Sequence, residues 1–213
     1  MSGWNQCQTL NMGRSMRDNH IILYIMKHLK ILLLAVLTVF AASACSQNRT
    51  KQTMEKKKVL VVYFSATGTT RQVAKQIAKT ADADICEIAP AKPYSSADLD
   101  WTNKQSRSSV EMNNPKARPE IKAVQVDVSE YDYIFLGYPI WWDLAPRVVN
   151  TFIETTNLAG KTVIPFATSG GSSIGNSVAV LKQLYPNIKW QSGKLLNRVN
   201  KKEIEAWVAT SMK

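Results

Sequence analysis

The feature that most constrains the fold is an alternation of apolar runs with helical patterns over residues 59–213. The runs "VLVVYF" and "YIFLGY" contain almost no polar residue, as expected of strands buried on both faces of a sheet. Strands are predicted at Val59–Phe64, Asp84–Ile88, Tyr133–Tyr138, Thr162–Thr168 and Ile188–Leu196, and helices at Thr70–Thr80, Pro146–Thr156, Gly175–Tyr185 and Asn200–Met212. This order predicts an α/β fold, with a doubly wound, five-stranded parallel sheet between two layers of helices.

The segment from Ala89 to Glu120, called the flap below, interrupts this alternation and carries few apolar residues. Long insertions without regular structure are uncommon in compact domains, and they usually serve as functional lids or are disordered. We expect a partly ordered flap with one short helix over Ser96–Gln105, capped by Ser95 or Ser96. Trp101 is its one obvious anchor.

Residues 26–47 have the layout of a secretory signal peptide, with a short basic start, an apolar run and small residues before Cys45. The apolar run is short for a membrane span. The letters "ASAC", which end at Cys45, resemble the lipobox of bacterial lipoproteins. The resemblance implies a signal peptide over 26–44 and a lipidated Cys45 that anchors the protein to a membrane, facing the periplasm or the cell exterior. An ordinary signal cleaved nearby, or a single anchoring helix, is the alternative.

Residues 1–25 fit no region of a signal peptide, so we expect translation to start at Met26 and the earlier stretch to be a non-native extension. Residues 45–58 are polar and basic, which predicts a flexible tether. Its charge is interpreted as a soluble surface, with attraction to anionic lipids as the alternative. The domain over 59–213 holds 18 basic and 14 acidic residues, a mild balance. Because it shows no basic stripe with interleaved aromatics, no nucleic-acid partner is predicted.

Three short loops are expected to meet at one edge of the sheet, beyond the carboxyl ends of its strands. The loop Ser65–Thr70 offers hydroxyls and a glycine just before a helix N-terminus, where backbone amides favour a phosphate. The loop Pro139–Asp143 supplies flat aromatic surface, and Ser169–Ile174 supplies exposed backbone polar groups. Together they describe a site for a mononucleotide that carries a large, flat heterocycle.

The letters "SATGTT", "LGYPIWW" and "ATSGGSS" resemble the three flavin loops of flavodoxins, in the same order along the chain. The resemblance covers essentially all of residues 59–213 and implies a flavodoxin-like fold with strand order 2-1-3-4-5 and a non-covalent FMN. It places the phosphate on Ser65, Ala66, Thr67, Gly68, Thr69 and Thr70, the isoalloxazine beside Pro139, Ile140, Trp141 and Trp142, and the ring edge on Thr168, Ser169, Gly170 and Gly171. Of the two adjacent tryptophans, we expect one to meet the ring and one to pack in the core.

Two departures from the flavodoxin pattern bear on function. Flavodoxins that carry electrons are usually acidic, and this domain is not. Their third loop often stacks an aromatic on the flavin, but here the nearest downstream aromatic is Tyr185. One flavin face would therefore be open, or covered by Trp101, and an open face would admit a quinone or a nicotinamide.

Other classes of protein fit the sequence less well. Gly171–Gly175 reads G-x-S-x-G, the nucleophile pattern of α/β-hydrolases, but both histidines, His20 and His28, lie in the leader and the domain has no base for a triad. The P-loop lysine of NTPases, the acidic cluster of response-regulator receivers and a metal-binding cluster are all missing from the sequence. A non-catalytic lipoprotein that retains the fold is left as a remote alternative.

The sequence therefore predicts an FMN-binding redox protein that transfers electrons to a partner protein or to a small acceptor such as a quinone. The alternative is an FMN-dependent NAD(P)H or quinone reductase. No side chain stands out as a catalytic acid or base, and Asp143 is interpreted as a helix cap. The oligomeric state is not predicted.

Overall fold

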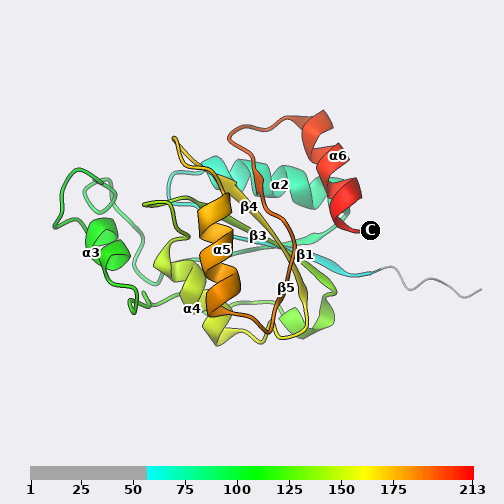
Figure 1. Ribbon diagram of the computed structural model, residues 1–213, viewed down its shortest axis with the longest axis horizontal. Helices are drawn as coiled ribbons and strands as arrows, with labels where there is room; N and C mark the ends of the chain where they lie inside the picture. Colours follow the sequence, from blue (N-terminus) through cyan, green and yellow to red (C-terminus); the bar gives the residue numbers. More distant parts are fainter. Residues whose placement is uncertain (1–56) are drawn as a thin grey trace, which may run out of the picture. The chain divides into compact units, whose positions relative to one another are not determined.

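The computed structural model describes residues 57–213, and Figure 1 shows their arrangement. The expected leader, the lipidated Cys45 and all but the last two residues of the tether lie outside the described residues. Within 57–213, no helix has both the length and the apolar character needed to cross a membrane.

The sheet has the predicted strand order, β2-β1-β3-β4-β5, and its strands pair in parallel. The strands are β1 (Val59–Tyr63), β2 (Asp84–Glu87), β3 (Tyr133–Pro139), β4 (Thr162–Thr168), β5 (Lys189–Trp190) and β6 (Lys194–Leu195). All five residues of β1 are buried, which confirms that this apolar run is a central strand.

Helices cover both faces of the sheet, so that the fold has three layers (Figure 1). The main helices are α2 (Thr69–Ala81), α4 (Arg147–Thr155), α5 (Gly175–Leu184) and α6 (Lys201–Ser211). Alternate residues of β1 pack into different layers: Leu60 and Val62 join the core with α4 and α5, whereas Val61 and Tyr63 join the core with α2 and α6. The predicted positions of these four helices are confirmed to within one or two residues at each end.

The predicted edge strand is broken into β5 and β6, which both pair with β4. Val163 lies opposite Trp190, and Phe166 lies opposite Lys194. Between these two pairs the edge strand therefore contains one residue more than β4. The break falls beside Pro165, which has no N–H to donate to a neighbouring strand.

Helix α6 begins at Lys201, one residue after the predicted start, because Asn200 is its N-cap and accepts a hydrogen bond from the Glu203 backbone N–H at 3.2 Å. In a capping box the Glu203 side chain would bond back to the Asn200 N–H, but here it has a different partner. The Glu203 carboxylate forms an ion pair with Lys194 of β6 at 3.1 Å. The start of α6 is thereby tied to the edge of the sheet.

The helix expected at Ser96–Gln105 is wrong. The flap helix is α3 (Arg107–Asn113), and its N-cap is Ser106, whose side chain accepts from the Ser109 N–H. Short polar side chains bond to nearby backbone groups over the predicted span, where Asp98 accepts from the Ser95 N–H and Asp100 from the Thr102 N–H. Such local bonds compete with a helix and favour turns.

Gly137 in β3 allows a close approach between its strand and a side chain of the core. A Cβ at this position would lie 2.1 Å from Cζ of Phe166, which belongs to the neighbouring strand β4. The Phe166 ring also makes an edge contact with Trp207 of α6, at 6.5 Å between centroids. The glycine therefore lets one aromatic side chain link the sheet to the α6 layer.

We predict that Gly137→Ala lowers the free energy of unfolding by roughly 2 kcal/mol or more, because the new methyl group overlaps a fully buried ring. Urea denaturation followed by circular dichroism measures the change. Gly171→Ala is the matched control, since a Cβ there meets nothing within 4 Å. Equal stability of the two variants would contradict the packing argument.

Candidate functional site

The first predicted loop connects β1 to α2 and ends in an uncapped helix N-terminus. Gly68 adopts φ 94°, a left-handed conformation that favours glycine, and its N–H donates to Ser65 Oγ at 3.1 Å. No side chain caps α2, and its first turn contains no acidic residue. The amides of this turn therefore remain available to an anion, and the helix dipole favours one there. The Thr67 and Thr69 side chains are exposed beside them.

The second predicted loop closes in a tight turn with a strained backbone. Trp141 and Leu144 exchange backbone hydrogen bonds of 3.0 and 2.9 Å, so that Trp142 and Asp143 are the two central residues. Both have positive φ, 46° and 62°, as in a type I′ turn, where Asn-Gly is the preferred pair. This turn holds Trp142 45% exposed.

Asp143 is not the helix cap that the sequence suggested. The N-cap of α4 is Pro146, without a side-chain hydrogen bond. Asp143 instead occupies the last central position of the turn, and its carbonyl accepts a hydrogen bond from Asn176 Nδ2 of α5 at 3.2 Å. The turn that carries Trp142 is thus tied to the start of α5.

The third predicted loop is held by hydroxyl groups and by one residue that the sequence analysis missed. The Thr168 and Thr70 hydroxyls, both buried, lie 2.9 Å apart and join the end of β4 to the start of α2. Ser169 Oγ accepts from the Gly171 and Ser172 backbone amides, at 3.1 and 2.8 Å. The Ser169 N–H donates to Asn197 Oδ1 at 2.8 Å. Asn197 follows β6 in a polar stretch, so only the fold places it here.

These three loops and the flap line one cavity of about 590 Å³, within the usual range for small-molecule sites. Its lining residues are Ala66, Thr67, Thr70, Leu99, Trp101, Ser108, Pro139, Ile140, Trp141, Trp142, Ser169, Gly170, Gly171 and Ser172. An adjoining recess of about 280 Å³ adds Thr69, Thr168 and Asn197. Among the described residues that line these two spaces, none carries a charged side chain.

A separate cavity of about 490 Å³ is lined by residues 121–124, 126–129 and 155–157. None of the three predicted loops contributes to it. It also lies away from the carboxyl ends of the strands, where ligands bind in this class of fold. We therefore assign the candidate site to the cavity between the loops and the flap.

An aromatic cluster joins the second loop to the flap. Trp141 makes edge contacts with Phe64 and with Tyr94 of the flap, at centroid distances of 5.5 and 5.2 Å. Trp141 is therefore the tryptophan that packs, as expected for one of the pair, and Trp142 is the one left exposed in the cavity. These contacts couple the position of the second loop to that of the flap.

Tyr94 also carries the polar contacts that hold α3. Its hydroxyl donates to the Glu111 carboxylate, and the Arg107 guanidinium lies over its ring at 4.0 Å. Arg107 Nε in turn donates to Glu111 at 2.6 Å. Burial, with the Glu111 carboxylate beside it, raises the pKa of the Tyr94 hydroxyl well above its ordinary value. The tyrosine therefore stays protonated and serves as a hydrogen-bond donor.

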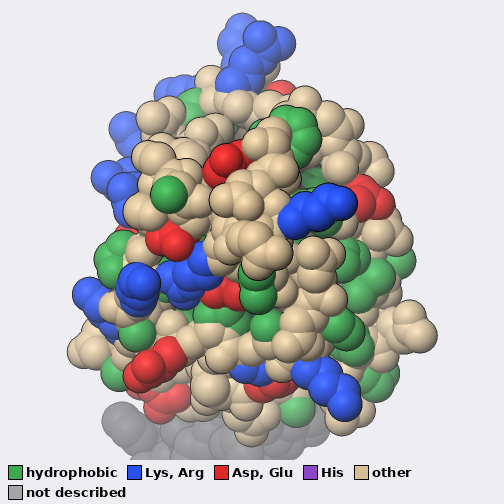
Figure 2. Space-filling view, turned by 90° about the vertical axis from the view of Figure 1, so that its left-hand side faces the viewer, with side chains coloured by type: hydrophobic (Ala, Val, Ile, Leu, Met, Phe, Trp, Pro, Cys, Tyr) green, Lys and Arg blue, Asp and Glu red, His purple; other side chains and the backbone are tan. Residues whose placement is uncertain are grey.

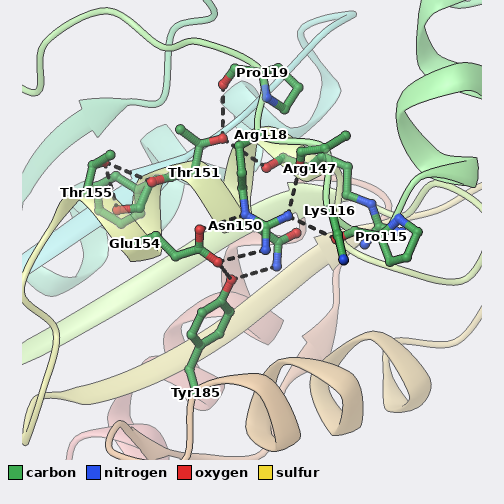
Figure 3. Close-up of polar contacts among 12 residues, drawn as sticks. Pro115, Lys116, Arg118, Pro119, Arg147, Asn150, Thr151, Glu154, Thr155 and Tyr185 are labelled. Carbon is green, nitrogen blue, oxygen red and sulfur yellow. Dashed lines mark hydrogen bonds and ion pairs between the residues drawn. The ribbon is translucent and has the colours of Figure 1, made fainter.

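The far end of the flap is fastened to α4 by the network drawn in Figure 3. Arg118 donates to both oxygens of the Glu154 carboxylate at 2.7 and 2.8 Å, and the Tyr185 hydroxyl donates to the same carboxylate at 2.7 Å. The buried Arg147 donates to the Met112 carbonyl at the end of α3, at 2.9 Å. Tyr185 belongs to this network and lines neither space of the site, so it does not cover the cavity.

Trp101 does not anchor the flap as the sequence suggested, because its side chain is 74% exposed. It does line the cavity, as expected if it covers part of the site. Leu99 and Ser108 of the flap line the cavity as well, and neither was singled out from the sequence. No local sequence pattern places Leu99 and Ser108 at the site, because they reach it only through the path of the folded flap.

A family model described as flavodoxin matches residues 58–211. A candidate flavoprotein from Bacteroides eggerthii DSM 20697 has 59% sequence identity and a TM-score of 0.71, over 74% of this chain and 99% of that chain. A candidate flavoprotein from Bacteroides uniformis ATCC 8492 has 53% identity and a TM-score of 0.70, over 72% and 98%.

A more distant likeness concerns the fold alone. A flavoprotein from Lactobacillus acidophilus NCFM, solved in complex with FMN, has 22% identity and a TM-score of 0.58, over 71% of this chain and 98% of that chain. No curated protein sequence matches the chain.

Relief of the strained turn should stabilise the protein. We predict that Asp143→Gly raises the free energy of unfolding by about 0.5–1 kcal/mol, because glycine adopts φ 62° without a steric penalty. Asp143→Val should lower it, since a β-branched residue resists positive φ. Urea titrations compare both variants with the wild type, and the reverse order of stability would contradict the type I′ turn.

The Arg118–Glu154 pair should make flap attachment depend on pH. The hydrogen bonds from Arg118 hold the pKa of Glu154 below its ordinary value of 4.5, so the pair stabilises the fold above that value. As the pH falls through the lowered pKa, protonation removes this contribution. Since the pair is about one-third exposed, we expect about 1 kcal/mol or less.

Glu154→Gln tests this expectation by urea denaturation between pH 7 and pH 3. The gap in stability between wild type and variant should be widest at pH 7 and should close in the acid range. Glu130→Gln removes a carboxylate from a more exposed pair with Lys58 and serves as the control. A gap that stays constant with pH would exclude the ion pair as its source.

Proposed function

Because the chain belongs to the flavodoxin family, we propose that it binds FMN non-covalently in the cavity between the loops and the flap, and that it transfers electrons through the flavin. One observation carries the proposal. The loops after β1, β3 and β4 line the cavity together with the uncapped N-terminus of α2, and three tryptophans are among the lining residues. The strand order reverses between β1 and β3, and ligands bind at such switch points.

The first loop suits a phosphate that is held and does not react. Thr67 and Thr69 offer exposed hydroxyls, and the first amides of α2 offer N–H donors with a favourable dipole. Gly68 leaves open space where another residue would carry its Cβ, so the backbone can approach a ligand closely. Hydrogen bonds from neutral donors to a charged acceptor are among the stronger ones in proteins.

The second and third loops suit a flat ring. Trp142 presents an exposed aromatic surface inside the cavity, and Pro139 and Ile140 add apolar contacts beside it. Gly170 and Gly171 expose their backbone because no side chain covers them. A bound flavin supplies the exchange of one or two electrons, while the protein positions the ring and tunes its potential.

The lining residues also limit the chemistry that the protein itself can add. None of the described lining residues carries a carboxylate, an ammonium group, an imidazole or a thiol. The side chains of the site can therefore bind, orient and shield, but they cannot exchange a proton near neutral pH. This composition favours electron transfer over acid–base catalysis.

A second candidate function is the reduction of a small acceptor by the loaded protein itself. The third loop carries no aromatic residue, and the cavity continues from the sheet loops to Leu99 and Trp101 of the flap. Such space beside the ring would admit a substrate. For the segment before residue 57, we propose the lipid anchor at Cys45 predicted above, which would place either activity at a membrane surface.

The visible spectrum of the purified protein, with the mass of its extracted flavin, tests the proposal. We predict bound FMN, and we predict that Thr67→Ala weakens FMN roughly tenfold or more, because one hydrogen bond to the phosphate is lost. Riboflavin, which lacks the phosphate, should bind both proteins alike. Quenching of flavin fluorescence measures each dissociation constant.

Thr210→Ala, in the exposed part of α6, is the matched control and should bind FMN as the wild type does. A protein that stays colourless after addition of FMN would exclude the proposed function. If the loaded protein consumes NADPH or NADH in the presence of a quinone, the reductase is favoured over the carrier.

A further inference from the structure

We propose that Leu99 and Trp101 of the flap form, with Trp142, a second subsite in the same cavity, and that it binds an uncharged planar ring of the quinone class as electron acceptor. The inference rests on the proposed function, since a flavin in the same cavity would be the electron donor.

The cavity has two walls of different origin. One wall comes from the three loops at the carboxyl ends of the strands, and the other comes from Leu99, Trp101 and Ser108 of the flap. The Ser108 N–H donates to the Asp98 carbonyl at 2.9 Å, which fixes the start of α3 beside residues 99–101. The flap wall is therefore fixed by a backbone hydrogen bond, although it lies outside the sheet.

Two large aromatic side chains lie unburied along this cavity. Trp101 is 74% exposed and Trp142 is 45% exposed, one from each wall. Because both side chains line the same cavity, a ligand between the two walls can contact both rings. Aromatic rings bind other flat rings by offset stacking or edge contact, which selects a planar ligand.

The charges beside the flap wall disfavour an anionic ligand. Asp98 and Asp100 flank Leu99 and Trp101 along the chain, and hydrogen bonds from Ser95 and from Thr102 lower the pKa values of the two carboxyls. Both are therefore ionised at neutral pH. Asp143 adds a third carboxylate directly after Trp142.

None of the described lining residues carries a positive charge, although Lys92 and Arg107 lie near Asp98 and help to lower its pKa. Arg107 adjoins the lining residue Ser108, but its guanidinium is paired with Glu111 at 2.6 Å. Figure 2, which faces the flap side, shows basic side chains along one edge and both signs of charge among uncharged groups elsewhere. A dinucleotide with two phosphates would meet repulsion at the flap wall, whereas a neutral ring would not.

The proposed redox step needs only the reduced flavin as electron donor and the quinone as acceptor. A quinone takes up two electrons and two protons, becomes the quinol, and leaves the flavin oxidised. Since no lining side chain can donate a proton, both protons come from the reduced flavin or from water at the open mouth of the cavity. Leu99 and Trp101 hold the acceptor ring, and Trp142, which borders the flavin, also contacts the acceptor.

Equilibrium binding to the oxidised, FMN-saturated protein tests the subsite, because oxidised flavin and quinone do not react. Menadione, an uncharged naphthoquinone, is titrated against the flavin absorbance band, and 1,4-naphthoquinone-2-sulfonate serves as the anionic probe. We expect saturable menadione binding that Trp101→Ala weakens roughly tenfold and Trp101→Phe largely restores. Val110→Ala, an exposed flap residue outside the cavity lining, should bind menadione as the wild type does.

We expect the sulfonate to bind several-fold more weakly than menadione, and Asp100→Asn to narrow that difference. A protein that takes up no FMN would overturn the proposed function and, with it, the subsite, which requires a flavin as electron donor. An FMN-loaded protein that binds menadione equally with and without Trp101 would overturn the subsite alone. Equal affinity for both probes would overturn the selection against charge.

Discussion

The site depends on the parallel pairing of β1, β3 and β4. Tyr63 pairs with Gly137 and Pro139 pairs with Thr168, so the loops that follow these strands leave the sheet at one edge. The hydroxyl pair of Thr70 and Thr168 then fastens the first helix to the end of β4. Because the strands are buried on both faces, this arrangement is backed by most of the hydrophobic core.

The flap is held by a different kind of interaction. Few of its side chains join the core, and its attachment rests on Tyr94 against Trp141, on Arg147 at the end of α3 and on the Arg118–Glu154 pair. Polar and partly exposed contacts of this kind contribute less than buried apolar surface, so the flap belongs to the less stable part of the domain. One wall of the cavity is thus supported by the core of the sheet, and the other by polar and aromatic contacts of the flap.

The errors of the sequence analysis share a cause. The helix expected at Ser96–Gln105 and the cap expected at Asp143 both lie in polar loops, where local side-chain bonds and turns compete on nearly equal terms. Asn197 could not be found either, because its bond to Ser169 joins two segments that meet only after β6 pairs with β4. The edge strand was predicted in place, but its break beside Pro165 depends on the register with β4.

The sequence by itself determined the layers, the strand order through its family resemblance, and the edge of the sheet where the loops converge. It could do so because buried strands and amphipathic helices leave periodic patterns that do not depend on distant partners. Only the tertiary structure decided which tryptophan packs and which stays exposed, where the flap helix begins, and that Leu99 and Trp101 face the loops. Those outcomes follow from contacts between segments far apart in the chain, and no local pattern of residues encodes them.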